Sequence, residues 1–222
     1  MSHGETIRMV AILGTLGFRA NSLLPTLEST PGVDKVVVFC NDHPRALEAL
    51  TDVQRVCSIM GIQIDRVAMP DAFDLLQAAK AMRQQVHHLK KDGHEIAVFN
   101  IAGGTKMMSA AALLVCAMEG LNSVYVHDET YREIPLPLLK VDYSQLLTTA
   151  QKEILTYIWT NRAKPMTQVD IALGMGKHKA TINHHIQMLE GKNILHLVED
   201  QSDRRRKVVR VDDALELMLE MD

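Results

Sequence analysis

The residue types best suited to chemistry gather in one short stretch, Asn100-Ile101-Ala102-Gly103-Gly104-Thr105-Lys106-Met107-Met108-Ser109. The apolar residues 96–99 precede it and an alanine-rich segment, 110–119, follows it, which predicts a strand, a glycine turn and a helix. Adjacent glycines let the main chain approach a ligand closely, and the free N–H groups at the start of a helix attract anions. Lys106 adds a positive charge, and Thr105 and Ser109 add hydroxyl groups. This pattern predicts a phosphate-binding turn.

Two other interpretations of the stretch have to be weighed. The glycines can serve packing alone, in a tight turn between a strand and a helix. The stretch is not a Walker A loop, because G-x-x-x-x-G-K-[ST] places four residues between its glycines, whereas Gly103 and Gly104 directly precede Thr105 and Lys106. Ordinary hydrolysis of a mononucleotide therefore receives no support.

The segments around this stretch predict an α/β fold with a doubly wound, Rossmann-like and mostly parallel sheet, because short apolar runs alternate with longer helical patterns. The predicted strands are residues 8–13, 35–40, 63–67, 95–100 and 123–127. The predicted helices are residues 19–28, 43–60, 71–91 and 106–120. Residues 133–141 contain two prolines and predict an edge strand or extended exit from the domain.

Ligands of such sheets bind at the carboxyl ends of the strands, where the strand order reverses. If the first and fourth strands are neighbours, residues 14–18 and 100–106 face one another across a crevice. A redox dinucleotide site is the alternative, but Gly14 and Gly17 form only G-x-x-G instead of G-x-G-x-x-G. Asp42 stands where a ribose-binding acid would lie, although a helix cap or turn before Pro44 is the simpler interpretation.

The composition of the chain limits the classes of protein to which it can belong. The chain has 222 residues, of which 47% are hydrophobic, and a net charge of −3, which argues against a uniformly basic nucleic-acid coat protein. Cys40, Cys57 and Cys116 are odd in number and widely spaced, so neither a disulfide framework nor a cysteine zinc site is predicted. Neither a signal sequence nor a bilayer-spanning stretch is predicted, and a cytoplasmic location is expected.

The pattern changes near residue 143, which divides the chain into predicted domains 1–142 and 143–222. Ser144 is expected to cap a helix that buries Leu147, Ile154, Leu155, Ile158 and Trp159. A second helix over residues 167–175, a turn at Gly176-Lys177 and a third helix from about His178 predict a helix-turn-helix. Residues 194–199 and 204–211, joined by a turn at 200–203, predict a β-hairpin wing.

Ile182, Ile186 and Leu189 should face the core of this second domain. The opposite face of the third helix then presents Ala180, Thr181, Asn183, His184 and Gln187, which suit the reading of bases in a major groove. Residues 177–210 hold eight Lys or Arg against four Asp or Glu. Phosphate contacts are expected from Lys177, His178, Lys179, Arg204, Arg205, Arg206 and Lys207. The adjacent pairs His184-His185 and His87-His88 point in different directions on a helix, so no metal site is predicted.

The two halves together resemble a known group of proteins. Gly14-Thr15-Leu16-Gly17-Phe18 and the stretch from Asn100 to Ser109 resemble a CARF domain, the CRISPR-associated Rossmann fold. Residues 175–182 and the wing resemble the winged helix of MarR-like and ArsR-like regulators. The order of these domains is that of CRISPR-associated transcriptional regulators.

This resemblance implies a homodimer that binds double-stranded DNA and a cyclic oligoadenylate, with cyclic tetra-adenylate as the expected ring, and with no other cofactor and no membrane partner. The ligand-binding residues it suggests are Thr15, Leu16, Gly17, Phe18, Asn100, Ile101, Ala102, Gly103, Gly104, Thr105, Lys106 and Ser109. Gly103, Gly104 and Lys106 are expected to bind phosphates, while Thr15, Phe18 and Asn100 are candidates for contacts with ribose or adenine. The alternative is a ring nuclease in which Lys106 stabilises charge and Thr15 positions the ribose. An NAD-sensing repressor is a third candidate.

Overall fold

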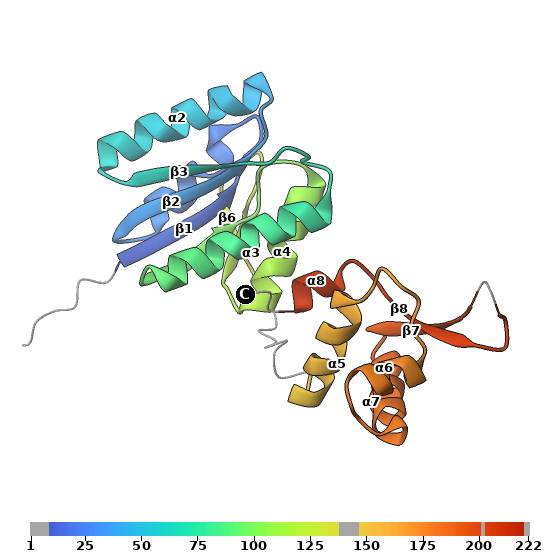
Figure 1. Ribbon diagram of the computed structural model, residues 1–222. Coiled ribbons are helices and arrows are strands. Elements are labelled where there is room, and N and C mark those ends of the chain that lie inside the picture. Colours follow the sequence, from blue (N-terminus) through green and yellow to red (C-terminus); the bar gives the residue numbers. More distant parts are fainter. Residues whose placement is uncertain (1–8, 138–146, 201–202, 220–222) are drawn as a thin grey trace, which may run out of the picture. The chain divides into compact units, whose positions relative to one another are not determined.

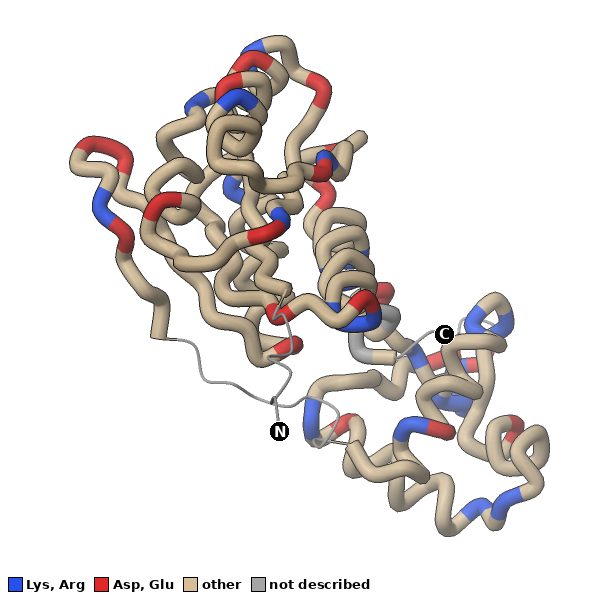
Figure 2. Tube along the Cα trace, turned by 90° about the vertical axis from the view of Figure 1, so that its left-hand side faces the viewer, with Lys and Arg blue, Asp and Glu red and all other residues tan. Residues whose placement is uncertain are grey.

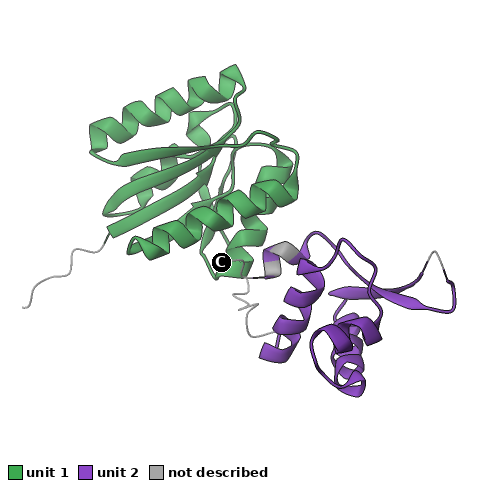
Figure 3. Cartoon of the chain, in the orientation of Figure 1, with its two compact units in different colours: residues 1–142 green, residues 143–222 purple. Residues whose placement is uncertain are grey.

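The chain forms two compact units, residues 1–142 and residues 143–222 (Figure 3). The structure is a computed structural model that describes residues 9–137, 147–200 and 203–219. Among these residues no helix is both long and apolar enough to cross a membrane.

The first unit is built on a six-stranded sheet in the order β3-β2-β1-β4-β5-β6. Neighbours from β3 to β5 pair in parallel, whereas β6 pairs antiparallel with β5 at the edge of the sheet. The predicted Rossmann-like α/β fold is confirmed, and the first and fourth strands are neighbours. The strands are β1 Met9–Thr15, β2 Val33–Cys40, β3 Gln63–Ala68, β4 His94–Asn100, β5 Ser123–Val126 and β6 Glu133–Leu136.

Helices cover both faces of this sheet (Figure 1). On one face the short helix η1 (Ala20–Ser22), α1 (Leu24–Ser29) and α2 (Pro44–Met60) pack on Ile12, Val36 and Val38. On the other face lie α3 (Leu75–Lys91) and α4 (Lys106–Glu119). Because side chains alternate along a strand, Phe39 and Phe99 point to this second face, where their rings stack with centroids 5.6 Å apart.

The structure corrects the first predicted helix, residues 19–28. Pro25 lacks an N–H group and fits only the first turn of a helix, so a new helix, α1, begins just before it and the segment divides at Leu23 into η1 and α1. The helix predicted from residue 71 begins at Leu75, since Asp74 caps it by accepting a hydrogen bond from the Gln77 N–H at 3.0 Å. The proline-rich strand ends at Leu136; residue 8 and residues 138–141 of the predicted strands lie outside the described residues.

The described part of the second unit is a winged helix, formed by the helices α5, α6 and α7, a two-stranded antiparallel sheet and the short helix α8. Its elements are α5 Thr149–Thr160, α6 Gln168–Gly174, α7 Lys179–Gly191, β7 Leu195–Glu199, β8 Lys207–Val211 and α8 Leu215–Met218. Thr148 caps α5 in a capping box with Gln151, whereas the predicted cap, Ser144, lies outside the described residues. One buried cluster, which includes Trp159, Ile182 and Leu195, joins the three helices to the wing.

The three cysteines are free thiols buried in the first unit. Burial raises the pKa of the Cys116 thiol to about 12 and also raises the pKa of Cys57, because an uncharged thiol is favoured away from water.

Candidate functional site

A pocket of about 520 Å³ opens at the carboxyl ends of the central strands in the first unit. Three segments contribute to its wall: the loop after β1 with η1, the loop after β4, and the hairpin between β5 and β6. The lining residues are Gly17, Phe18, Arg19, Asn21, Ser22, Ala102, Gly103, Gly104, Val126, His127, Asp128, Glu129 and Tyr131. The sequence predicted the first two segments and missed the third.

The glycines allow the loops after β1 and β4 to touch. A Cβ atom on Gly103 would lie 2.3 Å from the carbonyl oxygen of Thr15, and one on Gly17 would lie 2.8 Å from the Gly104 nitrogen. Gly104 also has a left-handed φ of 81°. Within the described part of the chain, the N–H groups of Gly103 and Gly104 donate to no protein acceptor. They are therefore available to an anion, and the phosphate contact expected of them stays a prediction.

The hydroxyl groups beside these glycines hold the loop in place. Thr105 caps α4 by accepting from the Met108 N–H at 3.2 Å, and its hydroxyl donates to the Ala72 carbonyl. The Ser109 hydroxyl donates to the Ile101 carbonyl at 2.8 Å. Lys106 is exposed at the first position of α4 and does not line the pocket. Its charge and the helix dipole both favour an anion at this end of α4.

Four predicted ligand residues have buried side chains that support the loops from inside the protein: Thr15 (0% exposed), Leu16 (1%), Asn100 (0%) and Ile101 (6%). The Thr15 hydroxyl lies 3.5 Å from the Asn100 carbonyl oxygen, so it does not face the pocket as a group that positions ribose. The Leu16 N–H donates to the Phe39 carbonyl at 2.9 Å. These side chains position the loops and make no contact with the opening.

Asn100 is the centre of a buried polar network. Its Nδ2 donates to the Ser22 carbonyl at 2.8 Å and to Thr26 Oγ1 at 2.7 Å, while its Oδ1 accepts from the Ala102 N–H at 2.9 Å. The Thr26 hydroxyl in turn donates to Glu133 Oε1 at 2.5 Å. Glu133 lies on β6 opposite Val126, which lines the pocket. The network therefore ties all three walls of the pocket together.

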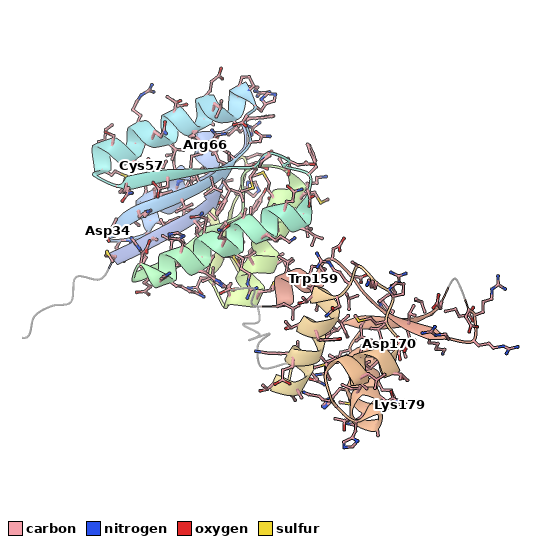
Figure 4. All side chains as sticks on the ribbon, viewed as in Figure 1. Asp34, Cys57, Arg66, Trp159, Asp170 and Lys179 are labelled. Carbon is pink, nitrogen blue, oxygen red and sulfur yellow. The ribbon has the colours of Figure 1, made fainter. Side chains whose placement is uncertain are left out.

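Phe18 is the predicted ligand residue that presents a large side chain to the pocket, since 47% of its surface is exposed. Its ring contacts His43 with centroids 4.6 Å apart, and the Arg45 guanidinium lies 4.7 Å from the ring centroid. His43, and not Asp42, caps α2. Asp42 pairs instead with Arg66, whose position on β3 is labelled in Figure 4, and this hydrogen bond raises the pKa of the guanidinium.

In the second unit, α7 carries the predicted core and surface faces. Ile182, Ile186 and Leu189 are 0% exposed, as predicted. Of the predicted contact residues, His178, Lys179, Ala180, Thr181, His184 and Gln187 are exposed, and Figure 4 labels Lys179 at the start of the helix. Asn183 is half-buried, because it lies beside Ile182 at the edge of the core face. The amine of Lys177 donates to Glu153 on α5 at 2.5 Å, so this predicted phosphate contact has an intramolecular partner.

The wing differs from its prediction in one respect. Arg204, Arg205 and Arg206 lie in the turn and not on the return strand, which begins at Lys207, because the Arg206 N–H donates to the Asp203 carbonyl at 2.9 Å. Of the predicted turn, residues 201 and 202 lie outside the described residues. The four consecutive basic residues are exposed; lysine and arginine are blue in Figure 2.

Arg206 also joins the wing to the start of α6. One of its guanidinium nitrogens lies 3.7 Å from Asp170 Oδ2. Hydrogen bonds from the Thr167 N–H and hydroxyl, followed by the charge of Arg206, lower the pKa of the Asp170 carboxyl. The ion pair joins the end of the basic turn to the first turn of α6.

Comparison with known proteins places the first unit in a described family. The model of the Csa3 CRISPR-associated Rossmann-like domain matches residues 10–137. Among curated proteins, none matches the chain.

Similar solved structures include three of a Staphylococcus aureus protein. MepR, a transcription regulator of the multidrug efflux pump MepA, is 25% identical with a TM-score of 0.31, over 34% of this chain and 56% of that chain. A MepR–DNA complex is 24% identical with a TM-score of 0.31, over 34% and 54%. MepR bound to ethidium bromide is 25% identical with a TM-score of 0.31, over 32% and 54%. The chain thus spans about half the length of these structures, and the winged-helix description rests on the order of its own elements.

Proposed function

Because the chain belongs to the family of the Csa3 CRISPR-associated Rossmann-like domain, we propose that it is a CRISPR-linked transcriptional regulator whose first unit binds a cyclic oligoadenylate and whose winged helix binds double-stranded DNA. The observation that carries the ligand proposal is the pocket of about 520 Å³ between the two glycine loops. Its open main-chain N–H groups suit phosphate, and the exposed ring of Phe18 suits stacking with a base.

The shape of the ligand supports a dimer. A ring of four adenylates has approximate two-fold symmetry, so one half-ring can occupy the pocket of each protomer across a C2 axis. A homodimer also presents two winged helices to two half-sites of DNA, and the affinity for such a site depends steeply on the spacing between the two helices. Ligand binding would regulate transcription by changing that spacing, which is a coupling between two distinct sites.

DNA binding is supported by the exposed face of α7 and the basic turn of the wing. Thr181, His184 and Gln187 offer donors and acceptors of the size that reaches base edges. Arg204, Arg205 and Lys207 are exposed cations that suit the neighbouring phosphates.

The first experiment is incubation of the purified protein with cyclic tetra-adenylate, following binding by calorimetry and the ring by chromatography. Tight binding with an intact ring is expected. Lys106→Ala should weaken binding at least tenfold, because it removes a cation at the start of α4, whereas the exposed Lys91→Ala on α3 should bind like the wild type. Both variants should retain binding to DNA without ligand. Wild-type protein that binds neither cyclic tetra-adenylate nor a related ring would overturn the ligand proposal.

A ring nuclease is the second candidate, and one observation favours it. The carboxylates of Asp128 and Glu129 line the pocket, although neither lies in the glycine motifs. A carboxylate near a ribose can accept the proton of its 2′-hydroxyl as that oxygen attacks the adjacent phosphorus and displaces the 5′-oxygen. Conversion of the ring to linear products that stops in Glu129→Gln or Asp128→Asn would establish this activity.

A further inference from the structure

The hairpin between β5 and β6 forms the wall of the pocket that no glycine motif marks. It begins at His127, whose N–H donates to the Arg132 carbonyl at 2.9 Å and whose carbonyl accepts from the Tyr131 N–H at 2.9 Å. Tyr131 has a left-handed φ of 54°, which a tyrosine rarely adopts. The turn is therefore closed around His127 by main-chain hydrogen bonds, and His127 and Tyr131 both line the pocket.

The turn also determines which nitrogen of the His127 ring carries the proton. Nδ1 accepts from the N–H groups of Glu129 at 3.2 Å and Thr130 at 3.3 Å. A ring nitrogen that accepts hydrogen bonds carries no proton, so the proton of the neutral imidazole lies on Nε2. In the described part of the chain Nε2–H has no protein acceptor. His127 is thus a donor with a fixed tautomer at the wall of the pocket.

The two residues that follow His127 carry hydrogen-bond acceptors instead of donors. Asp128 and Glu129 present carboxylates, which accept hydrogen bonds only, and Asp128 Oδ2 already accepts from the Tyr125 hydroxyl at 3.2 Å. These two carboxylates would repel the phosphates of a nucleotide. The Nε2–H of His127 supplies a donor on this wall, opposite in kind to the carboxylates beside it.

We propose that His127 contacts the bound ligand, donating from Nε2 to a phosphate or hydroxyl oxygen of a nucleotide held between the hairpin and the loop after β4. The inference deepens the proposed function and rests on it. In this arrangement the β5–β6 hairpin is a third wall of the site that contacts the ligand, and His127 is its hydrogen-bond donor.

The decisive variant is His127→Asn. The asparagine side-chain oxygen can take the place of Nδ1 and accept from the N–H groups of Glu129 and Thr130, as in an Asx-turn, but no group replaces Nε2–H. Calorimetry with cyclic tetra-adenylate should show a dissociation constant about tenfold higher than that of the wild type, the usual effect of losing one such hydrogen bond. His127→Gln, whose amide N–H lies near the position of Nε2, should recover part of the affinity. His88→Asn, an exposed histidine on α3, should bind like the wild type.

The outcomes separate the inference from the function on which it rests. Wild-type protein without affinity for cyclic oligoadenylates overturns both. If the wild type binds the ring and His127→Asn binds it with the same affinity, only the role of His127 is overturned. If His127→Asn has a lower melting temperature than the wild type, His127→Gln becomes the variant to compare with the wild type. If the two variants lose the same amount of affinity for the ring, so that glutamine restores none of it, donation from Nε2 is also contradicted.

Discussion

The Nδ2 of Asn100 lies 2.7 Å from the Thr26 hydroxyl, and that hydroxyl lies 2.5 Å from Glu133 on the edge strand β6. Asn100 and Thr26 are each 0% exposed. The Asn100 amide donates to the Thr26 hydroxyl, and that hydroxyl donates to the Glu133 carboxylate, so each donor has an acceptor. A ligand that displaces the loop after β4 would act on β6 through this chain of hydrogen bonds.

Thr26→Val is expected to break this network at its middle. Valine keeps the shape of threonine but leaves one Glu133 oxygen without its donor, which should lower the free energy of unfolding by about 1–3 kcal/mol. Denaturation by urea measures the change. Thr51→Val on α2 is the matched control, because the exposed Thr51 hydroxyl donates only to the Leu47 carbonyl of its own helix. If the two variants lose equal stability, the network contributes nothing specific.

Gly103→Ala is expected to separate the loops after β1 and β4. The new methyl group would meet the Thr15 carbonyl oxygen and the Leu16 main chain, which belong to rigid backbone. A loss of about 1–3 kcal/mol in unfolding free energy and a weakened affinity for cyclic tetra-adenylate should follow. In Gly61→Ala, at a helix end with open space around it, strain from a φ of 72° lowers stability as well. Retained ligand affinity in Gly61→Ala and its loss in Gly103→Ala would locate the effect at the pocket.

Replacement of Arg204, Arg205 and Arg206 by alanine should weaken DNA binding and its dependence on salt. Each lost phosphate contact should reduce the slope of log K against log salt by about 0.9. Titration of a labelled duplex at several salt concentrations measures this slope. Arg55→Ala combined with Lys91→Ala lowers the positive charge outside the winged helix and should leave the slope unchanged. An unchanged slope in the arginine variant would remove the wing from the interface.

Glu119 should make a stabilising contribution that depends on pH. Burial alone would raise the pKa of this carboxyl, but hydrogen bonds from Lys90, Arg83 and His87 outweigh burial and lower the pKa from 4.5 to about 2. Because the folded-state pKa is depressed, the contribution is complete above about pH 4.5 and is lost as pH falls toward 2.

Glu119→Gln should therefore lower the unfolding free energy at pH 7 by about 2 kcal/mol, less than a fully buried pair would cost, since Lys90 and His87 are half-exposed. The deficit should shrink between pH 4.5 and 2 in acid-unfolding experiments. Glu28→Gln, an exposed residue of α1, supplies the comparison. A deficit that stays constant with pH would contradict the assignment.

The parts of the fold that follow from local patterns were predictable. Apolar runs and glycine turns located five strands of the first unit, and the spacing of Ile182, Ile186 and Leu189 located the core face of α7. Burial of polar groups was not predictable in this way. Asn100 follows a strand just as a ligand residue would, and only the packing of α1 over it shows that its amide is satisfied within the protein.

The hairpin wall was missed for a related reason. His127, Asp128 and Glu129 have no spacing typical of a known motif, and they reach the pocket through antiparallel pairing of β5 and β6. The sequence predicted that the segment from residue 133 would form an edge strand but could not say on which side its connecting turn would lie. Pairing between strands decides such positions, and pairing is not a local property.

The burial of Cys40, Cys57 and Cys116 has a practical consequence for measuring domain motion. These are the cysteines of the whole chain, and thiols buried away from solvent react slowly with maleimides and methanethiosulfonates. A single cysteine introduced on the exposed surface of either unit would thus react first and carry a fluorophore or spin label without prior removal of the native thiols. Distances between labels would then report directly how far the winged helices move when a ligand enters the pocket.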